Sequence, residues 1–210
     1  IRDSSMGEGY GPMIISKEKM TVEEAKNKVF AIPGVGTSAY LSLRLALGDV
    51  DYKVVPFDEI MPAIKSGKYD VGVIIHEGQL TWKDEGVNLV LDLGIWWNEK
   101  TGLPLPLGGN VVRKDLGLEM CGKITKDVRN SIEHSLSNPE EALKFAKEWG
   151  RGIDDETNEE FVGMYVNKRT LDYGDDGREA IRLFLRKGQE IGMVRSNLDV
   201  DSIVFVGSGE

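Results

Sequence analysis

Predicted strands and helices alternate through the first half of the chain, and this alternation constrains the fold more than any other feature of the sequence. Val29–Ile32, Tyr52–Val55 and Val71–Ile75 are predicted strands, and helical patterns over residues 39–47 and 59–65 separate them. Strand, helix, strand, helix, strand is typical of repeated βαβ units. The sequence therefore predicts an α/β fold with a mostly parallel sheet.

The apolar run Val71–Ile75 does not alternate with polar residues, which is typical of a strand buried on both faces in a parallel sheet. It ends at His76, and the polar residues Glu77 and Gln79 follow. Ligands of open α/β sheets bind just beyond the carboxyl ends of strands. An imidazole at such a place suits acid–base chemistry near neutral pH. A histidine that only caps the strand end and hydrogen-bonds locally is the alternative, and spacing alone does not separate the two.

A second candidate site follows the predicted strand Val29–Ile32, where the turn Pro33–Ser38 leads into the next helix. The first turn of a helix has free N–H groups and the positive end of the helix dipole, so it can bind a carboxylate or phosphate. Thr37 and Ser38 could add hydroxyl donors, or one of them could be a plain N-cap. Because the carboxyl ends of parallel strands share one edge of a sheet, we expect this turn and His76 at the same edge.

The second half of the chain predicts a crossover followed by helices. Alternating prolines in Leu103–Gly109 favour a stiff extended crossover, a natural hinge between lobes, with a strand over 110–113. From Leu118 the chain is predicted to be helical. A loop is predicted over 167–173, and a long helix over 175–191. Apolar residues at helical spacing mark one apolar stripe along the first of these helices: Met120, Ile124, Val128, Ile132 and Leu136.

Composition excludes several classes of function. The 210 residues carry a formal net charge of −9, which argues against a nucleic acid or an anionic membrane as partner. The single cysteine excludes an internal disulfide and a cysteine metal cluster, and two histidines argue against a histidine-rich metal site. No apolar run approaches the roughly 18 residues that a membrane helix needs.

Five strings of residues together resemble one family: Gly7–Pro12, Pro33–Ala39, Ile74–Thr81, Asp92–Gly108 and Tyr165–Asn167. The chain looks like the 1,4-dihydroxy-6-naphthoate synthase family of the futalosine route to menaquinone, from about residue 5 to about residue 192. That family is related to chorismate dehydratase and to type II periplasmic solute-binding proteins. The resemblance implies a two-lobed fold of the type II periplasmic-binding-protein kind, with the substrate in the cleft between the lobes.

The resemblance also implies roles for particular residues. His76 corresponds to the base that starts the breakdown of cyclic de-hypoxanthine futalosine, and the helix-start turn corresponds to the carboxylate-binding point. We expect substrate contacts from Gly36, Thr37, Ser38, Ala39 and Glu77. A cytoplasmic enzyme with a small carboxylate-bearing substrate and with no metal or organic cofactor is expected. The smaller lobe is expected over 16–109, and residues 1–15 and 110–210 are expected in the larger lobe.

The resemblance has one departure, because family members begin with a further βαβ segment that lines the opposite wall of the cleft. This sequence starts after that segment, so either it is a piece of a longer protein or the protein lacks part of the pocket. In the second case, a solute-binding module for a small carboxylate becomes the alternative to an enzyme. A chorismate dehydratase-like lyase is a third reading, against which the string Ile75-His76-Glu77 speaks.

Overall fold

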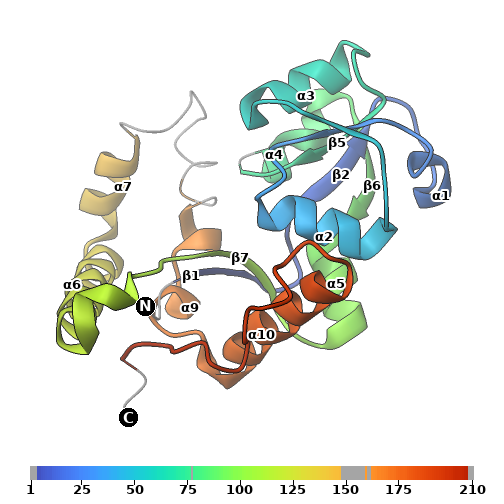
Figure 1. Ribbon diagram of the computed structural model, residues 1–210. Coiled ribbons are helices and arrows are strands. Elements are labelled where there is room, and N and C mark those ends of the chain that lie inside the picture. Colours follow the sequence, from blue (N-terminus) through green and yellow to red (C-terminus); the bar gives the residue numbers. More distant parts are fainter. Residues whose placement is uncertain (1–3, 77, 148–158, 160–161, 208–210) are drawn as a thin grey trace.

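The computed structural model describes residues 4–76, 78–147, 159 and 162–207, and these residues form two sheets with helices around them (Figure 1). The strands are β1 (Ser4–Gly7), β2 (Met13–Ser16), β3 (Phe30–Ile32), β4 (Tyr52–Val54), β5 (Val71–Ile74), β6 (Asn88–Asp92) and β7 (Leu105–Gly109). The helices of the first half are α1 (Val22–Ala25), α2 (Ser38–Leu47), α3 (Phe57–Lys65), α4 (Gly78–Thr81) and α5 (Leu93–Thr101), with a 3-10 turn over Trp82–Glu85.

The larger sheet has five strands in the order β4-β3-β5-β2-β6. Strand β3 is parallel to β4 and β5, whereas β2 is antiparallel to β5 and β6. Four strands therefore run in one direction, which confirms a mostly parallel sheet, and β2 runs against them because it enters from the edge where they end. The segments that follow β3, β4, β5 and β6, and the segment that precedes β2, consequently share one edge.

Helices cover both faces of this sheet because successive side chains of each strand point to opposite faces. Ile14 and Phe30 pack with Leu43 of α2 in one core cluster, whereas Ile15 and Ala31 pack with Ile60 of α3 in another. The buried, non-alternating sequence of β5 is explained in the same way, since all four of its residues are buried between the two helix layers. The sheet between its two helix layers forms a three-layer core, which holds β5, and therefore His76 beyond its end, in place.

The smaller sheet pairs β1 with β7 in antiparallel register, from Ser4 opposite Gly109 to Gly7 opposite Leu105. The extended chain predicted over Leu103–Gly109 is thus partly a strand. Pro106 is accommodated beside a register shift between Ser5 and Met6, in a two-stranded ribbon where both strands are edge strands. The strand predicted over 110–113 is wrong: those residues form no strand, and Val111 is 90% exposed.

The remaining helices are α6 (Gly117–Ser137), α7 (Pro139–Lys147), α9 (Lys168–Leu171) and α10 (Gly174–Glu190), with a 3-10 turn over Lys114–Leu116. The long helix predicted over 175–191 is confirmed by α10. The loop predicted over 167–173 is wrong, because Asn167 and Thr170 form a capping box that starts the short helix α9.

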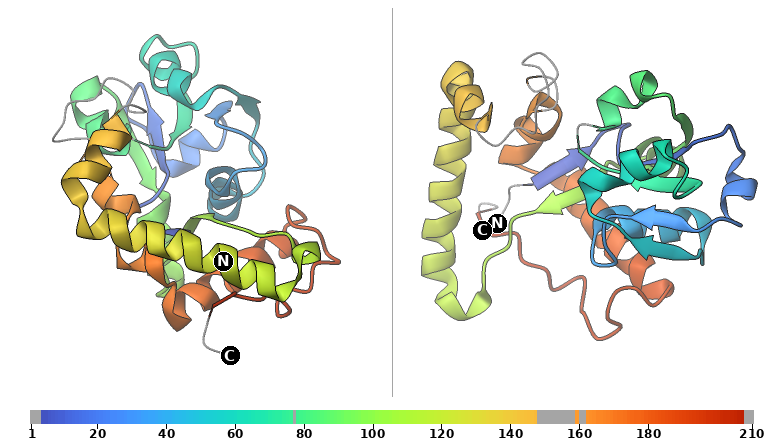
Figure 2. Two further views of the ribbon diagram at one scale, coloured as in Figure 1. Left: turned by 90° about the vertical axis from the view of Figure 1, so that its left-hand side faces the viewer. Right: turned by 90° about the horizontal axis from the view of Figure 1, so that it is seen from above.

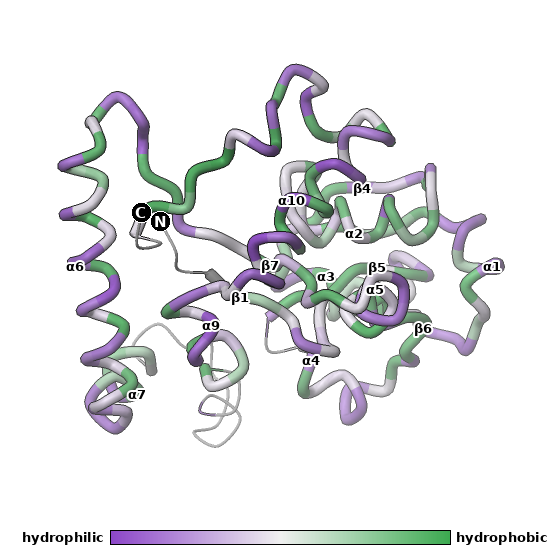
Figure 3. Tube along the Cα trace, turned by 90° about the horizontal axis from the view of Figure 1, so that it is seen from below, coloured by the Kyte–Doolittle hydropathy of each residue, from purple (hydrophilic) through white to green (hydrophobic). Residues whose placement is uncertain are grey.

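Helix α6 is confirmed, and its apolar stripe is only partly buried. Met120 is 45% exposed and Leu136 is 38% exposed, while the buried residues of α6 are Cys121 and Thr125. In Figures 2 and 3 the helix stands apart from the five-stranded sheet, with hydrophobic and hydrophilic positions around it. The other stripe residues, Ile124, Val128 and Ile132, are half-buried, and α6 contacts α7 and α9. No helix in the described ranges is long and apolar enough to cross a membrane.

The two sheets are joined through α10, which contacts both α2 and β7. Leu41, Trp97, Leu105 and Phe184 form a buried cluster at this junction, where the rings of Trp97 and Phe184 meet edge-on at 5.4 Å. The division into lobes at residues 16 and 109 stays a prediction. The five-stranded sheet itself is built from residues 13–92.

Candidate active site

His76 lies where the sequence predicts it, two residues beyond the carboxyl end of β5 and directly before the segment that enters α4. It is half-buried, and its φ of 63° makes it the one non-glycine residue with positive φ in the described part of the chain. A residue with a Cβ adopts this conformation only at an energetic cost. Such strained residues concentrate at functional sites, where the surrounding structure holds them.

Phe57 and Gln79 are two neighbours of His76 among the described residues. The ring of Phe57, the first residue of α3, lies 4.5 Å from the imidazole between ring centroids. The backbone N–H of Gln79 donates to the His76 carbonyl at 3.0 Å, and Gln79 is only 4% exposed. Glu77, predicted to contact the substrate, lies outside the described residues. The imidazole is therefore placed against an aromatic ring at the sheet edge.

The predicted carboxylate turn lies at the start of α2. Thr37 is the N-cap: its hydroxyl oxygen accepts from the Tyr40 N–H at 3.1 Å, and the hydroxyl donates to the Gly34 carbonyl at 2.7 Å. The Ser38 hydroxyl donates to the Leu107 carbonyl in β7. Thr37 is thus a plain N-cap, and the hydroxyl protons of Thr37 and Ser38 are both used within the chain.

The backbone of this turn keeps donors for an anion. The N–H groups in the first turn of a helix have no acceptor within the helix, so those of Ser38 and Ala39 point beyond its start. Ala39 is 2% exposed, whereas Gly36 is exposed. A carboxylate at this point would therefore be held by main-chain groups and the helix dipole rather than by hydroxyl groups.

The turn and His76 share one edge of the sheet because β3 and β5 are parallel neighbours, with Ala31 opposite Gly72. Figure 1 shows the start of α2 and the helix α4 on the same side of the sheet, the side turned towards α9. The expected edge is confirmed. The roles of His76, Gly36, Thr37, Ser38 and Ala39 stay predictions.

Two tyrosines to which the sequence motifs give no role in the site, Tyr10 and Tyr165, reach this edge. The Tyr165 hydroxyl donates to the side-chain oxygen of Gln79 at 3.2 Å, and its ring meets that of Tyr10 edge-on at 6.3 Å. Burial raises the pKa of the Tyr10 phenol, and the charge of Glu8 raises it further. Tyr165 is 86 residues from Gln79 in the sequence, so only the string Tyr165–Asn167 marked it beforehand.

Asp92 ends β6 at the same edge and caps α5. Its carboxylate accepts from the N–H groups of Gly94 at 2.8 Å and Ile95 at 3.0 Å. Burial raises the pKa of this carboxyl group, and the two hydrogen bonds oppose that effect. Sequence reasoning placed Asp92 only within a family string. Because its carboxylate accepts both of these hydrogen bonds, Asp92 has a structural role at this edge as the N-cap of α5.

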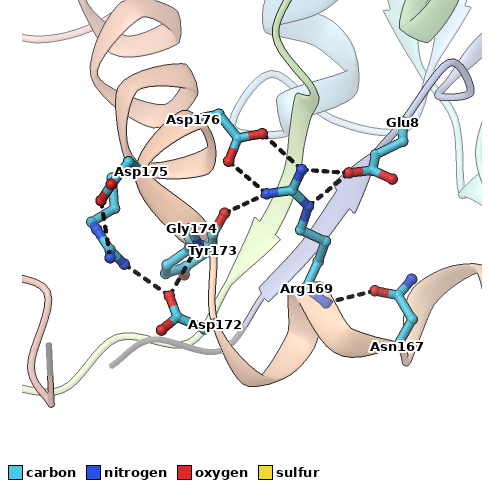
Figure 4. Close-up of polar contacts among 9 residues, drawn as sticks. Glu8, Asn167, Arg169, Asp172, Tyr173, Gly174, Asp175 and Asp176 are labelled. Atoms are coloured by element: carbon cyan, nitrogen blue, oxygen red, sulfur yellow. Dashed lines mark hydrogen bonds and ion pairs between the residues drawn. The ribbon is translucent and has the colours of Figure 1, made fainter.

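A charged cluster around Arg169 of α9 lies beside the smaller sheet, at the start of α10 (Figure 4). Its guanidinium binds both carboxylate oxygens of Asp176, at 2.6 and 2.7 Å, and donates to Glu8 at 2.6 Å and to the Tyr173 carbonyl at 2.8 Å. This pairing lowers the pKa of the Asp176 carboxyl group and raises that of Arg169. The positive charge of Arg169 is thus paired with the carboxylates of Glu8 and Asp176. In the parts of the chain that are described, no three metal-ligating side chains gather to form a metal site.

Comparison with known proteins assigns the family. The sequence profile described as "Menaquinone biosynthesis" matches residues 3–190. The chain belongs to the menaquinone biosynthesis family. Two curated relatives, both named 1,4-dihydroxy-6-naphthoate synthase, come from Streptomyces coelicolor (33% identical, covering 96% of this chain and 72% of the relative) and Thermus thermophilus (38% identical, covering 86% and 66%). The prediction of an enzyme of menaquinone biosynthesis is confirmed at the level of the family.

Solved structures confirm the fold of this family member. A protein of Archaeoglobus fulgidus has a TM-score of 0.87 at 37% identity, covering 92% of this chain and 72% of that chain. The aliphatic sulphonate-binding protein of Escherichia coli has a TM-score of 0.60 at 14% identity, covering 98% and 68%. An alkanesulfonate-binding protein of Xanthomonas axonopodis has a TM-score of 0.64 at 13% identity, covering 96% and 72%. The two sulphonate-binding proteins show the fold alone, and that fold is the predicted α/β fold of type II periplasmic binding proteins.

Proposed function

We propose that this protein forms 1,4-dihydroxy-6-naphthoate from cyclic de-hypoxanthine futalosine, with His76 as the general base. The observation that carries the proposal is the position of His76, held at positive φ just beyond the end of the central strand β5 in a chain of the menaquinone biosynthesis family. Two relatives named for this product, at 33% and 38% identity, support the choice of reaction.

The geometry of the sheet edge suggests how the substrate is held. Its carboxylate would accept from the N–H groups of Ser38 and Ala39, at the positive end of the α2 dipole. His76 leaves the next strand along this edge, so an imidazole and an anion site flank a planar substrate from two sides. For proton transfer, the imidazole nitrogen must lie within about 3 Å of the substrate atom that bears the proton, or reach it through one water.

The remaining expectations are part of the same proposal. We propose a small carboxylate-bearing molecule as the partner, held at the start of α2; the formal net charge of −9 argues against a nucleic acid or an anionic membrane. The chemistry assigned to His76 and the α2 amides is proton transfer and anion binding, for which we invoke no metal or organic cofactor. We place the enzyme in the cytoplasm.

Product analysis tests this function. The natural full-length protein is incubated separately with cyclic de-hypoxanthine futalosine and with chorismate, and the products are followed by mass spectrometry. We expect 1,4-dihydroxy-6-naphthoate from the first and no product from the second. Tight binding of the first compound without any product would contradict the proposal and favour a solute-binding protein. Conversion of chorismate would favour the lyase reading.

A further inference from the structure

Gln79 connects the candidate base to the other side of the molecule. It lies in α4, is 4% exposed, and donates its backbone N–H to the carbonyl of His76 at 3.0 Å. Its side-chain oxygen accepts the hydroxyl hydrogen of Tyr165 at 3.2 Å. One buried residue therefore touches the turn of His76 with its backbone and Tyr165 with its side chain.

Tyr165 is itself fixed from the side of the smaller sheet. Its carbonyl accepts from the hydroxyl of Ser5 in β1 at 3.3 Å and from the hydroxyl of Thr170 in α9 at 2.9 Å. Its ring packs edge-on against Tyr10, in the segment that connects β1 to β2. The hydroxyl of Tyr165 is thus presented to Gln79 by contacts with β1, α9 and the β1–β2 connection.

The turn at His76 needs support of this kind. Positive φ is unfavourable for a residue with a Cβ, and it persists only where surrounding contacts impose it. Helix α4 has four residues, and a single turn is too short to be stable by itself. Tertiary contacts must therefore hold α4, and the buried amide of Gln79 is hydrogen-bonded to Tyr165.

We propose that Tyr165 is a positioning residue for His76 that acts through Gln79 and does not itself touch the substrate. The catalytic part of this inference rests on the proposed role of His76 as general base. Removing the hydroxyl deprives a buried amide oxygen of its donor, which is costly enough to make α4 and the His76 turn shift. A small displacement of a base away from its substrate lowers turnover strongly.

The test uses Tyr165→Phe, which keeps the ring against Tyr10 and removes only the hydroxyl. Tyr52→Phe is the matched control, because Tyr52 lies in β4 at 40% exposure and its ring packs on Tyr40 at 4.9 Å. We expect kcat of Tyr165→Phe to fall about 10- to 100-fold with KM nearly unchanged, and the control to retain wild-type values.

A spectroscopic measurement reports on the position of His76 without any substrate. The chain has two histidines, and the side chain of His134 is 67% exposed, so NMR of isotope-labelled histidine rings contains its own reference. We expect Tyr165→Phe to move the His76 ring resonances and to leave those of His134 in place. Gln79→Met, which removes the acceptor at the other end, should move the same resonances, and the double variant should add no further change.

Unchanged His76 resonances in folded Tyr165→Phe and Gln79→Met would overturn the proposal. So would a loss of kcat in the double variant equal to the product of the two single losses, because the residues would then act independently. If the wild-type protein makes no product, the proposed function is overturned, and the ring resonances alone decide whether Tyr165 positions His76.

Discussion

At the residue scale, the edge of the sheet that carries His76 depends on two positions where the backbone restricts which side chain can be present. His76 is held at positive φ, and Gly94 lies directly against the main chain of Tyr10. A Cβ at Gly94 would lie 2.0 Å from the carbonyl carbon and oxygen of Tyr10. The start of α5 and the segment before β2 can approach each other only because this residue has no side chain.

Gly94→Ala is therefore expected to destabilise the fold. The clash is with backbone, which cannot move aside as a flexible side chain can, so the free energy of unfolding should fall by about 1–3 kcal/mol. The corresponding loss in Tm is roughly 2–4 °C per kcal/mol for a chain of this size. Thermal unfolding followed by circular dichroism measures it.

Gly122→Ala is the matched control for this prediction. Gly122 lies inside α6, and a Cβ there would meet nothing within 4 Å. Alanine favours a helix interior over glycine by about 1 kcal/mol, so this variant should be unchanged or slightly more stable. Equal Tm values for the two variants would contradict the close approach at Gly94.

At the element scale, the sequence predicts elements whose signals are local. The buried runs of β3 and β5 and the capped start of α2 are such elements, so the edge that carries His76 was predictable. The antiparallel direction of β2 was not predictable, because it follows from the place of β2 in the chain and not from its own residues. The hydrogen bond between Tyr165 and Gln79 spans 86 positions and leaves no local pattern.

Other predictions failed where the structure of a segment depends on contacts that its own residues do not specify. The apolar spacing of α6 predicts one apolar stripe, but the stripe is only partly buried, with Met120 and Leu136 exposed. The strand predicted over 110–113 has no neighbouring strand to pair with in the parts that are described. A polar stretch became the helix α9 because Asn167 and Thr170 cap it reciprocally, a signal weaker than apolar periodicity.

Arg169 and Asp176 join two of these elements, α9 and α10, and make their attachment sensitive to acid. The guanidinium holds the pKa of the Asp176 carboxyl group below its ordinary value of 3.8. A depressed carboxyl pKa adds stability above the unfolded value, and this contribution is lost as pH falls from 3.8 through the folded value. Since the Asp176 side chain is 46% exposed, solvent screening limits the contribution to about 1 kcal/mol or less.

Asp176→Asn should therefore be less stable than the wild type at pH 7, and the difference should shrink below pH 3.8. Urea unfolding at pH 7 and pH 3 measures this. Asp175→Asn is the neighbouring control, because that side chain is fully exposed and its ion pair with Arg178 is looser, at 3.3 Å. A deficit for Asp176→Asn that is the same at both pH values would show that charge pairing is not its cause.

At the scale of the whole molecule, two sheets meet through α10, and the edge where β3, β4, β5 and β6 end is turned towards α9 and β1 (Figure 1). The candidate base, the start of α2 and Tyr165 come to this edge from distant parts of the chain. The fold of type II periplasmic binding proteins brings these segments to one edge of the sheet. In this family member, the same arrangement supports the proposed chemistry.

Turnover of cyclic de-hypoxanthine futalosine by His76→Asn tests the central claim most directly. Asparagine tolerates positive φ, so the variant should keep the wild-type circular dichroism spectrum and fold while losing the base. The matched variant His134→Asn changes an exposed histidine of α6. We predict that kcat of His76→Asn falls about 10²- to 10⁴-fold while His134→Asn stays at the wild-type rate; a folded His76→Asn protein that turns over substrate at the wild-type rate would contradict the account.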